Sequence, residues 1–187
     1  MFSWLVGSRT MVNTQAFTDD VASRLSNRVQ LSTDANHSYI PAIERSFGYH
    51  GVDYGQIIKR FARVDGSQRA GRYSPSKEVV SIEKSVILGK PSLENISTAY
   101  IERQNLQMRM NIRRFTRLTN AFSRKAANHA YAVAMHYMVY NFIRPHGTLT
   151  KAAGGVKTTP AMAAGVADRV WTVEDILARM DENFLLQ

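Results

Sequence analysis

The chain has 187 residues, of which 24 are Lys or Arg and 15 are Asp or Glu, so its formal net charge is +9. Its 44% hydrophobic residues can build a core, which excludes a disordered chain. The absence of cysteine excludes disulfides, Cys-ligated zinc, iron–sulfur clusters and thiol nucleophiles. No apolar run approaches the roughly 20 residues of a membrane helix, and no signal-peptide pattern opens the chain. We therefore expect a cytoplasmic protein without a membrane partner.

The positive charge is concentrated in residues 103–167. This tract carries ten basic side chains and no carboxylate. Such a surface attracts a polyanion, of which DNA and RNA are the most common. Arg outnumbers Lys in the tract, and Arg suits bidentate contact with phosphate. The alternative is a basic face that only contacts solvent, and we consider nucleic acid the better interpretation.

The first part of the chain alternates between predicted strands and helices. Residues 2–6 have the apolar pattern of a short buried strand, and residues 13–27 repeat apolar side chains every four residues, as in a helix. Residues 29–34 alternate apolar and polar side chains, which predicts a strand ending at Asp34. A short helix is expected over 36–47, and 52–61 is predicted as a strand, with a helix as the alternative.

The second part is predicted to be mainly helical. After a basic loop at 62–78, residues 79–88 indicate a strand or hairpin. Helices are expected from 97 or 98 to 114, from 119 to 143, and in two short pieces at 160–164 and 173–180. This order of elements indicates an α/β fold followed by long basic helices.

Two carboxylates stand out as candidates for chemistry. Asp34 ends a predicted strand, which is where α/β sheets bind ligands. Thr-Asp-Ala-Asn is equally good turn or helix-cap chemistry, and on this segment alone the cap interpretation is favoured. Glu102 lies early in a helix, with Asn105 and Arg109 at i+3 and i+7 on the same face. Such a carboxylate can hold a divalent cation while the guanidinium holds a phosphate. A helix-start carboxylate stabilised by the dipole is at least as good an interpretation.

A third constellation is Tyr-Asn-Phe-Ile-Arg-Pro-His at residues 140–146, followed by Thr-Pro-Ala at 159–161. His146 could cap a helix end or contact a phosphate, but a lone His is more often structural. The chain contains no GxGxxG, GxSxG, HExxH or Walker motif, so the usual nucleotide-binding, hydrolase and zincin interpretations fall away.

Together, several segments resemble bacterial insertion-sequence transposases of the DDE type. They are TDANHSYIPAIERSFG at 33–48, YIERQNLQMRMNIRRFTRLTNAFS at 100–123, YNFIRPHGTL at 140–149 and TPAMAAG at 159–165. The second segment is the most specific, because it combines a helical Glu, an Arg seven residues later and a basic continuation. Together the segments span most of the chain.

The resemblance implies an RNase H-like core in which three carboxylates bind Mg²⁺ or Mn²⁺ ions for metal-assisted attack on a DNA phosphodiester. Asp34 matches the second Asp of that set and Glu102 matches the Glu, so both would be catalytic metal ligands. The resemblance also places a group of residues against DNA: Arg103, Asn105, Arg109, Arg113, Arg114, Arg117, Arg144 and His146. Residues 1–150 would form the partial core, with an insertion at about 62–96, and residues 151–187 a helical tail.

One departure from the family matters. Its first catalytic Asp lies on the first strand, whereas this chain starts at what corresponds to the third strand, so the core would lack its first two strands. Asp19 and Asp20 do not substitute, because they fall on a predicted helix. We therefore expect a transposase part that is inactive alone, and that is marginally stable, homo-oligomeric or assembled with a full-length transposase at the bacterial nucleoid.

Two alternatives stay open. The chain could be a non-catalytic DNA-binding remnant that inhibits the full-length enzyme, which salt-dependent DNA binding without metal-dependent cleavage would favour. It could also be an unrelated RNA-binding protein, in which case Asp34 and Glu102 would lie more than about 10 Å apart, since paired catalytic ions sit only about 3.5–4 Å from each other.

Overall fold

The structure is a computed structural model that describes residues 3–63, 77–116, 120–121 and 123–184. It has the α/β composition that the sequence predicts. The described chain separates into two compact units, Phe2–Leu106 and Gln107 to the carboxyl end. The boundary near residue 150 that the resemblance implies falls inside the second unit.

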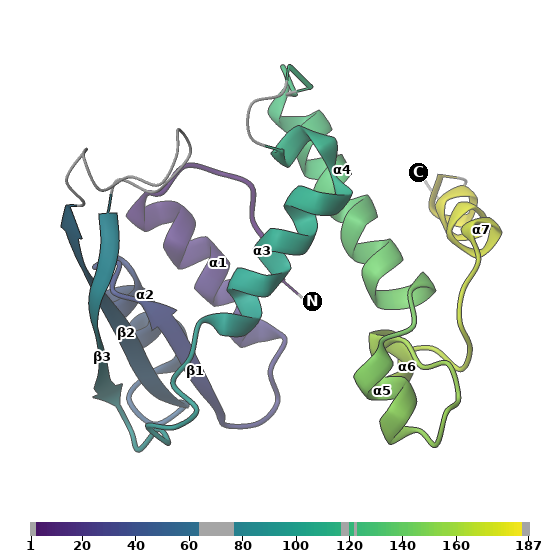
Figure 1. Ribbon diagram of the computed structural model, residues 1–187. Helices are drawn as coiled ribbons and strands as arrows, with labels where there is room; N and C mark the ends of the chain where they lie inside the picture. The colour runs from purple at the N-terminus through teal and green to yellow at the C-terminus, as the bar shows by residue number, and fades with distance from the viewer. Residues whose placement is uncertain (1–2, 64–76, 117–119, 122, 185–187) are drawn as a thin grey trace. The chain divides into compact units, whose positions relative to one another are not determined.

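The first unit is a three-stranded mixed sheet with two helices on one face (Figure 1). Its elements are α1 (Met11–Ser23), β1 (Val29–Asp34), α2 (Tyr39–Phe47), β2 (Val52–Arg63) and β3 (Lys77–Leu88). Strand β2 lies in the middle, parallel to β1 and antiparallel to β3. The strands expected at 29–34, 52–61 and 79–88 are thereby confirmed. The basic loop expected at 62–78 lies mostly outside the described residues.

Alternation along the strands gives the sheet two different faces. Val52 and Tyr54 of β2 are completely buried against Ile43 of α2, with the partly buried Val29 and Leu31 beside them. We call this side the core face. Successive side chains of a strand point to opposite sides, so Asp34, Ile57 and Lys59 belong to the opposite side, which we call the site face. The segment after β3 crosses the site face, because Gln30 on β1 bonds the backbone of Ser92.

The strand predicted at residues 2–6 is wrong. Ser3 to Val6 are irregular, and the side chains of Trp4, Leu5 and Val6 are 37–42% exposed. A strand needs a neighbour for its backbone groups, and within the described part of the chain none pairs with this segment. Ser3 instead donates a hydrogen bond to Asp20 on α1 at 2.6 Å. In the described sheet β1 is an edge strand.

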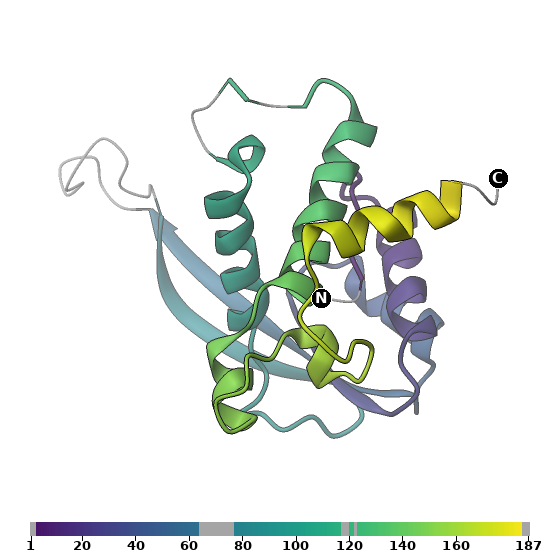
Figure 2. The ribbon, with the colours of Figure 1, turned by 90° about the vertical axis from the view of Figure 1, so that its right-hand side faces the viewer.

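Helices make up the second unit. Helix α3 (Ala99–Asn111) enters it from the first unit, and the 3₁₀ turn η2 (Arg113–Phe115) follows. Helix α4 (Ala126–Met138) starts later than the expected residue 119 and continues as a π-helical turn, η3 (Val139–Ile143), which Figure 2 shows running toward α5 (Gly147–Ala152) and α6 (Pro160–Ala163). Helix α7 (Val173–Phe184) closes the chain. The small core contains Met108, Val133 and Tyr137.

A network of hydrogen bonds around Asp53 fixes the turn after β3. Arg28 donates to both carboxylate oxygens of Asp53, at 2.9 and 2.6 Å, and the backbone N–H of Lys90 donates to the same carboxylate at 2.7 Å. These bonds hold the pKa of Asp53 far below its usual range, with the Arg28 bond as the main cause. Gly89 lies next to this network with φ +65°, and a Cβ there would overlap Asp53 Oδ1.

The network around Asp53 predicts that substitution of two glycines with the same backbone conformation lowers the free energy of unfolding by different amounts. Gly48 also has φ +65°, but a Cβ there would meet no atom within 4 Å. Gly48→Ala should therefore lower the free energy of unfolding only through the strain of a positive φ, by about 1 kcal/mol. Gly89→Ala should lower it by roughly 1–3 kcal/mol more through overpacking. Chemical denaturation of the two variants measures this difference. Equal losses of unfolding free energy in the two variants would show that the network around Asp53 does not constrain Gly89.

Candidate carboxylate site and nucleic-acid interface

Asp34 ends β1 and is exposed to solvent. Its Oδ1 accepts the backbone N–H of Asn36 at 3.3 Å, and Asn36 in turn accepts the N–H of Ser38, which precedes α2. The turn chemistry considered for Thr-Asp-Ala-Asn is therefore present. One long hydrogen bond leaves most of the acceptor capacity of this carboxylate unused, so the turn does not conflict with a second role.

A partly buried relay of hydrogen bonds ends on the backbone of Asp34. Gln56 Nε2 donates to the Tyr54 hydroxyl at 2.7 Å, Tyr54 and Thr33 hydroxyls lie 2.8 Å apart, and Thr33 Oγ1 donates to the Asp34 carbonyl at 2.8 Å. Since Thr33 spends its only proton on the carbonyl, Tyr54 must donate to Thr33. Burial raises the pKa of Tyr54, which keeps this donor protonated. The relay fixes the strand end that carries Asp34.

Glu102 lies in the first turn of α3 and is clamped through one oxygen. Its Oε1 accepts from Lys59 Nζ at 2.5 Å and from Thr98 Oγ1 at 2.9 Å. The Lys59 bond, and then the Thr98 bond, lower the pKa of Glu102, so the carboxylate is ionised without a metal. The side chains of Lys59 and Glu102 are 32% and 55% exposed, which makes this pair a surface ion pair.

Strand register and one ion pair bring Asp34 and Glu102 to the same face of the sheet. Asp34 is the parallel partner of Ile57 on β2. Lys59 follows Ile57 by two residues, so its side chain shares the site face, and Lys59 contacts Glu102. Two carboxylates far apart in the sequence are thus linked through one strand. Lys59 was not among the residues predicted from the sequence.

The basic residues predicted to contact DNA are mostly exposed. Glu102, Asn105 and Arg109 lie on one side of α3 by their spacing, and the exposed members of the predicted set are Arg103, Asn105, Arg109, Arg113, Arg114 and Arg144. Arg114 is partly committed, since it donates to Ser123 Oγ and the Asn128 carbonyl. Arg117 lies outside the described residues.

His146 is the exception, because its ring is packed inside the second unit. It stacks edge-on against Tyr140 with centroids 4.4 Å apart, and its Nε2 is buried without a partner in the described structure. Burial lowers its pKa, so the ring is neutral near pH 7. His136, which the sequence did not mark, is similarly buried with a lowered pKa. This environment favours the structural interpretation of His146, and its contact with DNA stays a prediction.

The carboxylates do not form a complete metal site. Within the described ranges, no group of three or more His, Cys, Asp or Glu side chains is placed to hold an ion. Asp19 and Asp20 lie on α1, as the sequence predicts, where they bond Ser46 and Arg24 respectively. With two carboxylates, one of them bound to an ammonium group, the residues present do not fit a pair of divalent ions.

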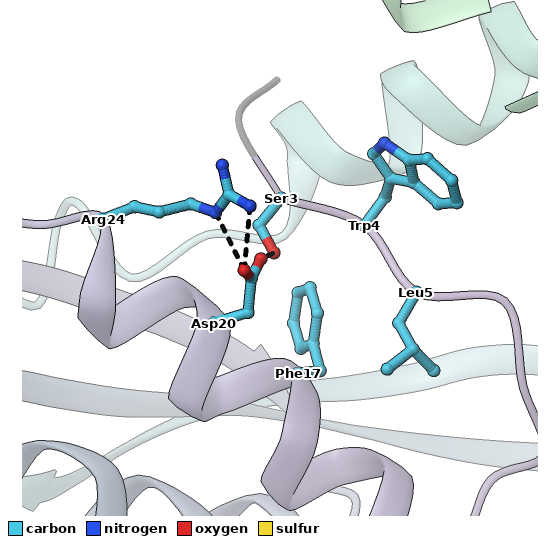
Figure 3. A pocket seen from close by; sticks show the side chains of 6 residues that line it. All are labelled: Ser3, Trp4, Leu5, Phe17, Asp20 and Arg24. Carbon is cyan, nitrogen blue, oxygen red and sulfur yellow. Dashed lines mark hydrogen bonds and ion pairs between the residues drawn. The ribbon is translucent and has the colours of Figure 1, made fainter. Parts of the chain in front are cut away.

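A shallow pocket lies elsewhere, between the irregular start of the chain and α1 (Figure 3). Trp4, Leu5 and Phe17 form its apolar wall, and Asp20, held by Ser3 and Arg24, forms its polar side. None of the predicted site residues lines it, and its carboxylate is already paired with a guanidinium. The pocket therefore offers no catalytic constellation.

Comparison with known proteins found no matching family model, no matching curated sequence and no matching solved structure. The described part of the chain contains no helix that is long and apolar enough to span a membrane.

The Glu102 clamp makes a testable prediction about ionisation. Lys59→Met should raise the pKa of Glu102, because the main contact that favours the charged form disappears. Thr98→Val should raise it less, since Thr98 is the second cause. Carbon-13 NMR titration of the Glu102 carboxyl measures both shifts. An unchanged pKa in Lys59→Met would contradict the ion pair.

Proposed function

We propose that this chain is part of a DDE-type transposase and acts in DNA transposition as a DNA-binding component that does not cut DNA by itself. The observation that carries the proposal is the placement of Asp34 and Glu102 on one face of the sheet, linked through Ile57 and Lys59 of β2. These are the two carboxylates that the resemblance to transposases selects from the sequence.

The charge of the chain supports DNA as the partner. The carboxylate-free tract begins directly after Glu102, and its arginines on α3 and η2 are exposed. Basic side chains in such a surface bind phosphates and release counterions, so the affinity falls steeply with salt. The same helix therefore carries a candidate carboxylate in its first turn and a candidate phosphate contact, Arg109, in its last.

The incomplete carboxylate set supports an inactive chain. Mg²⁺ or Mn²⁺ chemistry of the transposase type uses ions bridged by several carboxylates, and Lys59 already occupies Glu102 Oε1. A further carboxylate would have to come from another segment or another molecule. The unpaired outer edge of β1 in the described sheet is a suitable place for such a strand to add. This edge also favours the hypothesis that the chain assembles with full-length transposase and inhibits it.

DNA binding tests the proposal. We expect the purified chain to bind DNA oligonucleotides with a steep salt dependence, measured by fluorescence anisotropy at several salt concentrations. Arg109→Ala should reduce the slope of log K against log[salt] by about 0.9 for duplex DNA. Arg45→Ala is the matched control, because Arg45 is exposed on α2, outside the basic tract. Equal slopes in all three proteins would contradict the role of Arg109.

Cleavage by the same preparation should be absent. With Mg²⁺ or Mn²⁺, a supercoiled plasmid should stay intact, because the described residues supply no group of three carboxylates for the ions. Metal-dependent nicking that disappears in Glu102→Gln would show that the chain is a complete enzyme, and binding that is insensitive to salt would refute the DNA-binding role itself.

A further inference from the structure

Two lysines share the site face of the sheet with the candidate carboxylates. Lys84 on β3 is the antiparallel partner of Ile57, and Lys59 is the partner of Ile82, so Lys59 and Lys84 are diagonal neighbours on one face. Such diagonal side chains lie about 7–8 Å apart. The resemblance to transposases selects neither lysine, and both lie outside the basic tract.

The face beside these lysines is accessible. Ile82, next to both of them, is 60% exposed, and the paired residues Phe61 and Val79 farther along the two strands are 56% and 47% exposed. Lys84 itself is exposed and the Lys59 side chain is 32% exposed, so a partner can contact both lysines. An exposed sheet face that carries two neighbouring cationic groups suits a partner that is both anionic and extended.

Neither ammonium group is held strongly in place. Lys59 contacts Glu102 in a pair exposed to solvent, and such pairs contribute about 0–1 kcal/mol. Lys84 donates to the carbonyls of Leu93 and Glu94 at 2.7 and 3.2 Å, which are neutral acceptors. Among the described residues no carboxylate forms an ion pair with it. Lysine carries its charge on a flexible four-carbon stem, so each group can turn from its present partner to a phosphate.

From this geometry we propose that Lys59 and Lys84 form a second binding site for the phosphodiester backbone, which holds one DNA strand against the site face beside Asp34 and Glu102. Neighbouring phosphates of the strand contact the two ammonium groups. Lys59 exchanges Glu102 for a phosphate when DNA binds. This inference rests on the proposed DNA-binding function and names where, within the sheet, the strand is held.

Glu102 then acts as an internal competitor for the phosphate. Without DNA it neutralises Lys59, and with DNA it is released from Lys59 while Thr98 still donates to Oε1. Removing its charge should therefore strengthen the contact between Lys59 and DNA. This relation separates a phosphate-binding Lys59 from a lysine whose only role is to position Glu102.

The experiment measures the salt dependence of binding to a single-stranded oligonucleotide for the wild type, Lys59→Met, Lys84→Met and the double variant. Each single substitution should lower the slope of log K against log[salt] by about 0.7, the value per phosphate contact on single strands, and the double variant by about 1.4. Lys90→Met is the matched control. Lys90 is also exposed, but it follows β3 at the end paired with Tyr54, away from Ile57.

Glu102→Gln gives the second arm, with thermal unfolding as a check that every variant folds. Glu102→Gln should bind the oligonucleotide more tightly than the wild type does. This gain in affinity should vanish in the double variant Lys59→Met/Glu102→Gln. If the wild type binds but the slopes of Lys59→Met and Lys84→Met match that of Lys90→Met, the lysine site is refuted while the DNA-binding function stands. If the wild type does not bind DNA, the proposed function fails and takes this site with it.

Discussion

Parallel pairing of β1 with β2 is the constraint on which the rest of the site depends. In the observed register Asp34 lies opposite Ile57, and a shift by one residue would exchange the two faces of β1. The relay of hydrogen bonds from Gln56 through Tyr54 and Thr33 fixes this register on the core face. The site face follows from it, because alternation then places Asp34 and Lys59 on the same side.

Local patterns in the sequence predict the elements well where the elements carry their own signal. Alternation at 29–34 predicts β1, and Pro145 correctly limits the helical stretch before it. Residues 2–6 show the opposite case, because an apolar segment becomes a strand only when another strand pairs with it. Helix α4 begins after residue 119 for a related reason: sequence periodicity does not fix the point at which packing around Val133 and Tyr137 begins.

The candidate site was predicted only in part from the sequence. Asp34 and Glu102 could be selected through their resemblance to transposases, but their common face depends on register and on a contact between residues 59 and 102. Lys59 was missed because an alternating Ile and Lys on a strand has the pattern of an ordinary solvent-facing side. The burial of His136 and His146 was also not visible, since it depends on how Tyr137 and Tyr140 pack around the π-helical turn.

The distance between positions 34 and 102 tests the account most directly, and the absence of cysteine from the chain makes it easy to measure. Asp34→Cys/Glu102→Cys treated with a bifunctional maleimide should form an intramolecular cross-link. Gln30→Cys/Ser92→Cys is the positive control, since Gln30 bonds the Ser92 backbone on the same face. Cross-linking of both pairs is the predicted result. Cross-linking of the control pair alone would show that the two carboxylates do not form one site.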